Sequence, residues 1–181
     1  MKIQRKKGRM VPPLSAKKIE KTASGIRSGL ADPKERLNVV RFIELLLVPI
    51  MGLEFEVVEN HELGGDAAHT YPDKNLMRCT QKVYDGACAE NPRDIFTLAH
   101  EVGHFFLHKG TASFARSNEG REHQIYEDSE WQADEFASAF LMPLEVALEC
   151  NSEDELCEMY GVSRSAAEAR LRNINKRYKK K

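Results

Sequence analysis

The chain has 181 residues, of which 41% are hydrophobic and 30% are charged, and its net charge is -1. This size and composition predict one compact domain that can bury a core without disulfide bonds, and they exclude fibrous and wholly disordered proteins. The longest apolar stretch, residues 45–53, is interrupted by Pro49 and Gly52 and is far shorter than the roughly 20 residues that span a bilayer. The N-terminus lacks the apolar core of a secretory signal, so we expect a cytoplasmic protein that does not bind membranes.

Charge is distributed unevenly along the chain. Residues 1–36 hold 11 Lys and Arg against 3 acidic residues, residues 164–181 hold 8 against 1, and the segment between them is acidic. Basic ends can contact nucleic acid or an acidic partner, although solvated charge is the simpler explanation. The four cysteines form no closely spaced pair of the kind that binds zinc, and we interpret them as free thiols in a reducing compartment.

The N-terminal third of the chain predicts a tail and two helices. Residues 1–13 are predicted to be a flexible basic tail, after which Ser15 can cap a helix that runs toward Gly29. A second helix is expected to begin at Asp32. We expect it to end at Pro49, because proline removes a helical hydrogen bond.

Two strands and a long helix are predicted next. The segments Glu54–Glu59 and Asn75–Val83 are short and rich in β-branched residues, which is typical of strands. Asn91 and Pro92 then supply an N-cap and a first helical residue. They predict a helix of about four to five turns that continues to Leu107.

The C-terminal part of the chain predicts a loop followed by several helices. Residues 109–128 are polar with little periodicity and are expected to form a surface loop. A helix is predicted for Ser129–Leu141, and Pro143 blocks its continuation. Further helices on either side of a turn at Gly161 resemble a helix-turn-helix.

The segment His100-Glu101-Val102-Gly103-His104 carries the clearest chemistry. Inside the predicted helix, a step of four residues places both imidazoles on one face, where they can bind one metal ion. Glu101 lies on the flank of that face, where it can take a proton from an attacking water without itself binding the metal. Apolar neighbours follow directly, so two exposed histidines on a solvated helix explain the motif poorly.

A catalytic zinc ion usually has three protein ligands, so a third donor is expected downstream. We favour Glu130, because Asp134 lies one helical turn further on and can bond the outer nitrogen of a zinc-binding histidine, most simply His100. Four other acidic residues stay open as the third ligand: Glu127, Asp128, Asp134 and Glu135. His108 lies too far along the helix to share the ion with His100, and we assign it to stabilising the helix end.

Two segments carry a resemblance to a known family. Residues 96–104 read FTLAHEVGH with Leu107 and His108 behind them, and residues 130–137 read EWQADEFA ahead of residues 141–143, LMP. These segments resemble the ImmA/IrrE metallopeptidases, which are gluzincin-like zinc proteases. The order of the expected elements from about Leu53 to Ile174 is similar to that of the family.

The resemblance implies an α+β fold class, a mainly helical zincin-like metallopeptidase with a small β-sheet and a helix-turn-helix-like C-terminal tail. The metallopeptidase domain is then expected at residues 14–143 and the tail, packed against it, at residues 144–181. The implied metal is Zn²⁺, which Mn²⁺ could replace in the cell. Its expected ligands are His100, His104 and Glu130.

The resemblance also implies a substrate and a mechanism. Family members are typically cytoplasmic, often come from phages or stress-response systems, and cut a partner repressor of the helix-turn-helix type. We therefore expect a metalloendopeptidase that relieves repression, with Glu101 as the general base. The family architecture lets residues 75–83 act as an edge strand for an extended substrate. The second oxyanion donor stays open among four residues: Tyr71, Tyr84, Tyr126 and His123.

Two other hypotheses belong to different classes of protein. A DNA-associated regulator could use Ser163–Arg177 as a recognition helix, but this segment lacks a clear row of base-reading side chains, so we expect only weak, non-specific nucleic-acid binding. A toxin-like binding protein with an inert metal site is disfavoured because Glu101 is intact. On the enzyme hypothesis the basic tail, residues 1–13, is accessory and cleavage persists without it.

Overall fold

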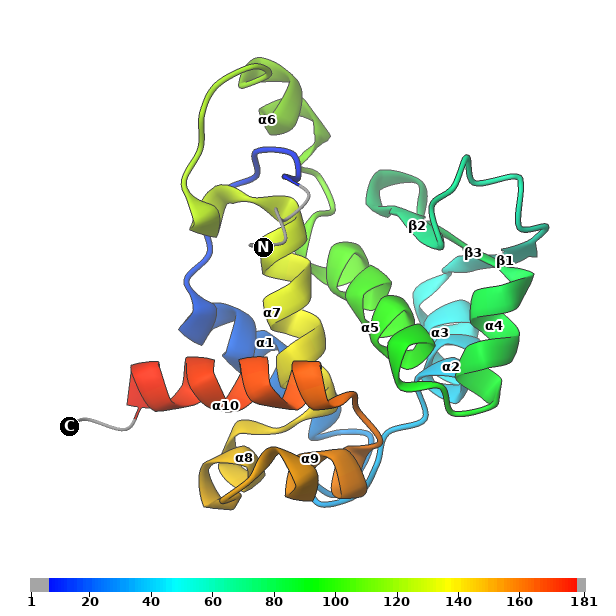
Figure 1. The fold of residues 1–181 in the computed structure, drawn as a ribbon. Coiled ribbons are helices and arrows are strands. Elements are labelled where there is room, and N and C mark those ends of the chain that lie inside the picture. The colour runs from blue at the N-terminus through cyan, green and yellow to red at the C-terminus, as the bar shows by residue number, and fades with distance from the viewer. Residues whose placement is uncertain (1–6, 179–181) are drawn as a thin grey trace.

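The computed structural model describes residues 7–178, so the first six residues of the predicted tail lie outside the described part of the chain. The protein is mainly helical with a small sheet to one side (Figure 1), which confirms the predicted α+β fold class. The helices are α1 (Ala16–Arg27), α2 (Val39–Phe42), α3 (Val48–Met51), α4 (Gln81–Cys88), α5 (Pro92–Leu107), α6 (Ala112–Ser117), α7 (Ser129–Leu141), α8 (Leu144–Glu149), α9 (Glu153–Tyr160) and α10 (Arg164–Tyr178). Within residues 7–178, no helix has both the length and the apolar character needed to cross a membrane.

The sheet has three strands in the order β1-β3-β2. β1 (Glu54–Val58) runs parallel to β3 (Leu76–Thr80), and β2 (Ala68–Tyr71) runs antiparallel to β3 on its other side. The expected edge strand at residues 75–83 is therefore wrong, because β3 is the central strand and ends where Thr80 caps α4. The edge strand beside α5 is β2, which the sequence pattern did not predict.

The second predicted helix begins later and ends later than expected. Asn38, rather than Asp32, caps α2 by accepting a hydrogen bond from the backbone N–H of Arg41. A π-helical turn at Ile43–Leu47 joins α2 to α3, so the helical path continues through Pro49. The wider π turn accommodates the proline ring, which would clash with a carbonyl in a regular α-helix.

Helices α5 and α7 pack side by side at the centre of the molecule (Figure 1). Asn91 caps α5 and Asp128 caps α7, each by accepting a backbone hydrogen bond in the first turn. Both helices bury apolar side chains in the core, among them Leu98 of α5 and Phe136 of α7, which are each 0% exposed. Gly103 lies in a close contact between the two helices, because a β-carbon at this position would come within 3.2 Å of the Ala133 backbone.

The N-terminal segment, residues 8–13, is docked against the start of α7. The backbone N–H of Val11 donates to the carbonyl of Glu127 at 2.8 Å, and the N–H of Ser129 donates to the carbonyl of Arg9 at 3.0 Å. The side chain of Val11 is 2% exposed. The prediction of a flexible tail therefore does not hold for this segment, because its backbone is paired and its apolar residue joins the core.

The predicted loop at residues 109–128 contains the short helix α6 and a 3₁₀ turn at Ile125–Glu127. The remainder of this segment is irregular and forms an arch beyond the end of α5 (Figure 1). The arch lies next to the docked N-terminal segment, with which it lines a hollow of about 580 Å³.

Helices α8 to α10 form the C-terminal tail, which is attached to the rest of the molecule by buried ion pairs. Arg170 of α10, 1% exposed, makes two hydrogen bonds of 2.7 Å to the carboxylate of Glu20 on α1 and a third to the carbonyl of Met142. Further along α10, Arg177 makes a similar bidentate pair with Glu135 of α7. One face of the helix that resembled a recognition helix is thus occupied by internal contacts.

Candidate metal centre and cleft

Three side chains from α5 and α7 converge on one point. The Nε2 atoms of His100 and His104 lie 3.0 Å apart, and the two oxygens of Glu130 lie 3.3 Å and 3.4 Å from them. The four-residue step on α5 produces the imidazole pair, and the first turn of α7 delivers the carboxylate. Within the described residues, these three side chains form the group of His, Cys, Asp and Glu that could hold a metal ion.

The spacing of this group fits a tetrahedral metal. Zinc binds nitrogen and oxygen at about 2.0–2.2 Å, which places two ligands of one ion roughly 3.4 Å apart. The separation of 3.0 Å between the two Nε2 atoms, and those of 3.3 Å and 3.4 Å to the two oxygens of Glu130, lie close to that value. Two neutral imidazoles and a carboxylate are also a donor set that suits zinc, and manganese to a lesser degree.

His100 is oriented by Asp134. Its Nδ1 atom lies 2.8 Å from Asp134 Oδ1, and since a carboxylate only accepts, Nδ1 donates and Nε2 is directed at Glu130. Burial lowers the pKa of His100, but the hydrogen bonds to Asp134 and Glu130 outweigh it and raise the pKa to about 10 in the metal-free protein. The hydrogen bond from His100 and the close approach of His104 hold the pKa of Glu130 well below its usual range.

His104 makes a different contact, which the sequence did not predict. Its Nδ1 atom lies 2.9 Å from Nδ1 of His108, whose Nε2 lies 3.2 Å from Oε1 of Gln132. His108 is 5% exposed, and burial together with the neighbouring His104 lowers its pKa to about 3. The expected role of His108 as a cation that stabilises the helix end is therefore wrong, because the residue is neutral at physiological pH.

Glu101 faces the cleft from the turn between the two histidines. Its carboxylate is buried, and Oε2 has no hydrogen-bond partner among residues 7–178. A buried carboxylate oxygen without a partner is costly, and such a group is expected to bond a water or substrate in the working site. The backbone carbonyl of Glu101 accepts a hydrogen bond from Thr70, which ties this part of α5 to β2.

The acidic residues that rivalled Glu130 are used elsewhere. Glu127 accepts the backbone N–H of Gln124, Asp128 caps α7, and Glu135 pairs with Arg177. Asp134 contacts His100 through the nitrogen that points away from the centre. Geometry therefore singles out Glu130 among the alternatives that the sequence left open.

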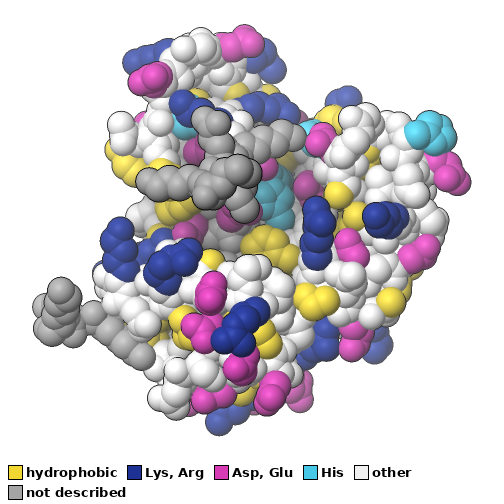
Figure 2. Space-filling view, viewed as in Figure 1, with side chains coloured by type: hydrophobic (Ala, Val, Ile, Leu, Met, Phe, Trp, Pro, Cys, Tyr) yellow, Lys and Arg dark blue, Asp and Glu magenta, His cyan; other side chains and the backbone are white. Residues whose placement is uncertain are grey.

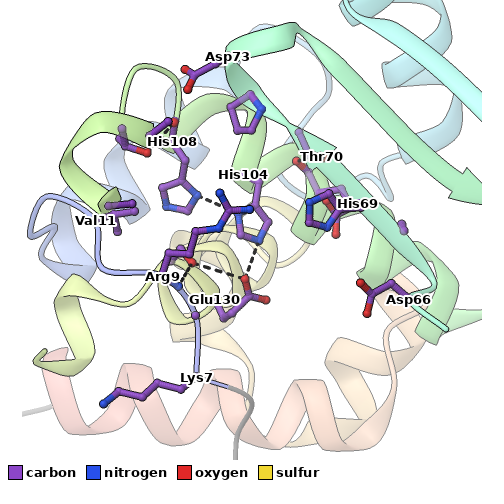
Figure 3. A pocket seen from close by; sticks show the side chains of 18 of the residues that line it. Lys7, Arg9, Val11, Asp66, His69, Thr70, Asp73, His104, His108 and Glu130 are labelled. Atoms are coloured by element: carbon purple, nitrogen blue, oxygen red, sulfur yellow. Dashed lines mark hydrogen bonds and ion pairs between the residues drawn. The ribbon is translucent and has the colours of Figure 1, made fainter. Parts of the chain in front are cut away.

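The centre lies at the bottom of a cleft of about 450 Å³. The view in Figure 2 shows histidine side chains inside a hollow of the surface, and Figure 3 shows the cleft from close by. One wall is β2, with His69 and Thr70, and the opposite wall is the docked N-terminal segment, with Lys7 and Arg9. Arg9 points into the cavity (Figure 3), and its side chain has no ion pair within the described part of the chain.

None of the four residues considered as oxyanion donors lines this cleft. Tyr84 donates to Glu44, and His123 contacts the α7 cap Asp128. The cleft instead offers Arg9 and His69. No sequence signal indicated Arg9, because its position depends on the docking of a segment that has no periodic pattern.

Comparison of the sequence with known protein families supports the interpretation of this site as that of a peptidase. Residues 60–172 match the sequence profile of the IrrE N-terminal-like domain, peptidase family M78, over more than half of the chain. The chain belongs to this family of peptidases, which confirms the resemblance that its two motifs carry. A comparison with curated proteins finds no significant match.

The fold also has a counterpart among solved structures. A Mycobacterium tuberculosis transcriptional regulator superposes with a TM-score of 0.58 at 16% sequence identity. The match covers 84% of this chain but only 46% of the regulator, so the chain spans about half the length of that protein. A likeness at this identity shows the fold alone.

Proposed function

We propose that the protein is a zinc-dependent metalloendopeptidase that cleaves an extended segment of a partner protein. The observation that carries this proposal is the convergence of His100, His104 and Glu130 beneath a cleft that also holds the unpartnered Glu101 carboxylate. Membership in a peptidase family supports hydrolysis of a peptide bond as the reaction.

Each residue has a distinct role in this proposal. His100, His104 and Glu130 hold the ion, which when bound supplies a Lewis acid that polarises the peptide carbonyl and makes water more acidic. Glu101 takes a proton from the attacking water and returns it to the leaving amine. Asp134 keeps His100 oriented, as its contact of 2.8 Å indicates.

The substrate is proposed to lie along β2. This strand is at the edge of the sheet, so the backbone groups on its outer side, which pair with no other strand among residues 7–178, can pair with an extended peptide. β2 packs against α5 and lines the cleft. Arg9 on the opposite wall can donate hydrogen bonds to a carbonyl or to an acidic side chain of that peptide. The cleft is thus suited to a polypeptide that has been locally extended.

We further propose a helix-turn-helix repressor as the partner and the cytoplasm as the compartment. The family resemblance is the main support for this substrate. The solved neighbour is titled a transcriptional regulator, which is consistent with a regulatory setting but does not identify a partner. A DNA-binding role for α10 is disfavoured, because Arg170 and Arg177 are engaged in pairs with Glu20 and Glu135.

Metal-dependent cleavage of a degenerate peptide mixture tests the reaction even while the partner is unidentified. The protein is stripped with a chelator, divided, and reloaded with Zn²⁺, with Mn²⁺ or with buffer, and new peptide termini are identified by mass spectrometry. The proposal expects cleavage in the zinc-loaded sample and none in the stripped sample. Equal cleavage in all three samples would contradict it. Intact-mass analysis of candidate repressors then tests the proposed substrate.

A further inference from the structure

A chain of hydrogen bonds runs from the docked N-terminal segment to the candidate metal centre. It begins at the carbonyls of Pro12 and Tyr126, passes through Gln132 and His108, and ends at His104. Gln132 is completely buried. Its first link, Pro12, lies outside residues 60–172, which match the peptidase family.

The orientation of the Gln132 amide is fixed by its surroundings. Its Nε2 atom lies 3.0 Å from the carbonyl oxygen of Pro12 and 2.8 Å from that of Tyr126. Carbonyl oxygens only accept, and two of them would repel an amide oxygen placed in the same position. The nitrogen must therefore face them, and Oε1 must face His108.

The position of each imidazole proton follows from this orientation. Oε1 of Gln132 only accepts, so the proton of His108 lies on Nε2, 3.2 Å away. The His108 ring is buried and has no hydrogen bond to a carboxylate among residues 7–178, so it is neutral and carries one proton. Its Nδ1 is therefore bare and accepts from Nδ1 of His104 at 2.9 Å. The proton of His104 then lies on Nδ1. Its Nε2 lone pair faces His100 and Glu130.

We infer that Gln132 and His108 are positioning residues, which set the tautomer of His104 so that Nε2 presents its lone pair to the metal. The inference rests on the proposed metal site and adds to it. His100 and His104 are oriented by different groups. The carboxylate of Asp134 orients His100, whereas the neutral imidazole of His108, itself bonded to the Gln132 amide, orients His104. The N-terminal segment takes part because Pro12 holds the amide.

The alternative tautomer would work against metal binding. If Gln132 were replaced by an apolar residue, His108 could carry its proton on Nδ1, directed at His104. Nδ1 of His104 would then have to accept, and its proton would move to Nε2, where it competes with the metal. Loss of the residue that orients a metal-binding histidine typically weakens metal affinity by about 10–100-fold.

The test uses the full chain and two readouts, neither of which is peptide cleavage. Long-range ¹H–¹⁵N NMR spectra of the histidine-labelled protein report which ring nitrogen carries the proton. The zinc dissociation constant is measured by competition with a chromophoric chelator for wild type, Gln132→Leu, His108→Leu and His108→Asn. The exposed His61 supplies a control variant, His61→Leu.

The inference expects an Nε2–H proton on His108, with or without zinc, and a mixture of tautomers in Gln132→Leu. His108→Leu should weaken zinc binding by about 10–100-fold. His108→Asn should recover much of the loss, because an asparagine oxygen can accept from Nδ1 of His104. His61→Leu should bind as wild type does.

Two results would overturn the inference: a proton on Nδ1 of His108, or equal zinc affinity in wild type and His108→Leu. If His108→Leu does not fold, the NMR spectrum of wild type still decides. A wild-type protein that binds no zinc would instead refute the proposed function. It would do so independently of the His108 tautomer.

Discussion

Gly103 of α5 and Ala133 of α7 lie in direct backbone contact, and a β-carbon at Gly103 would come within 3.2 Å of the Ala133 Cα and carbonyl oxygen. The same β-carbon would lie 3.2 Å from the Cβ of Phe136. The glycine follows Val102 in the metal motif, and Ala133 lies between Glu130 and Asp134. The absence of a side chain at residue 103 therefore allows the two motifs to meet at the candidate metal centre.

The first prediction concerns Gly103→Ala. Overpacking typically costs about 1–3 kcal/mol, which here outweighs the better helix propensity of alanine. We expect a lower free energy of unfolding, measured by urea denaturation, and weaker zinc binding, measured by chelator competition. Gly25→Ala is the matched control, because a β-carbon there has no atom within 4 Å and should stabilise helix α1 by about 0.5–1 kcal/mol. Unchanged zinc affinity in Gly103→Ala would contradict the role of this close contact.

The sequence predicts α5 and α7, which contain the site residues, better than it predicts the elements that line the cleft around them. Helices α5 and α7 have cap residues at their starts, Asn91 and Asp128, and strong apolar faces, so local physics is sufficient to place them. The step from His100 to His104 fixes two side chains on one face regardless of the rest of the fold. The contact between Asp134 and His100 could be predicted because Asp134 lies one helical turn after the expected ligand Glu130.

The elements around the site are held by tertiary contacts, which no local sequence pattern indicates. β2 has only four residues and is defined by its pairing with β3. Residues 8–13 dock largely through their backbone N–H and C=O groups, which leave no periodic pattern in the sequence, so composition alone suggested a tail. The π turn before Pro49 allows the helix to continue through this proline, and the sequence pattern did not indicate that turn. Gln132 and His108 became visible only when tertiary packing brought them together.

The second prediction tests the third ligand with two neighbouring glutamates. Glu130→Gln removes a charged oxygen from the centre and should lower zinc affinity by more than the roughly 10–100-fold that follows loss of a residue orienting a ligand. Glu135→Gln breaks the pair with Arg177 and should reduce stability without changing the zinc content. Metal analysis and thermal unfolding of both variants separate the two effects. Normal zinc content in Glu130→Gln would transfer the ligand role to another acid, first to Asp134.

The third prediction is the pH dependence of zinc affinity. In the metal-free protein the pKa of His100 is raised to about 10, so below that pH the histidine holds a proton that the metal must displace. Zinc affinity should therefore increase about tenfold for each unit of pH between about 6 and 8, with release of about one proton per ion. Calorimetry in buffers of different ionisation enthalpy measures that proton. An affinity that is constant over this range would contradict the assignment of His100.

The fourth prediction concerns the N-terminal segment. A β-carbon at Gly8 would clash with Ser129 Oγ and Glu130 Cγ, so Gly8→Val should displace the segment from the cleft. We expect slower cleavage of peptides and weaker zinc binding, since this segment supplies Arg9 to the cleft and Pro12 to Gln132. Deletion of residues 1–13 should have a similar effect, which reverses the expectation that this tail is accessory.

A milder variant separates the two roles of the segment. Arg9→Ala leaves the backbone hydrogen bonds to Ser129 in place, so it should raise the KM for peptides and leave the zinc content unchanged. Arg9→Lys should recover part of the loss, because lysine keeps the charge but not the planar donors of arginine. Equal KM values for wild type and Arg9→Ala would show that this arginine does not touch the substrate.

Glu101 is proposed as the base of a metal-dependent peptidase, and Glu101→Gln tests this role most directly. The amide has nearly the same shape as the carboxylate but cannot accept the proton of water, and Glu101 is not among the residues that would hold the ion. The measurement is the zinc content and the peptide cleavage rate of this variant beside wild type. We predict about one zinc per chain in both proteins and loss of about 100-fold or more of the cleavage rate in Glu101→Gln. Cleavage at the wild-type rate by a zinc-loaded Glu101→Gln protein would contradict the proposed mechanism.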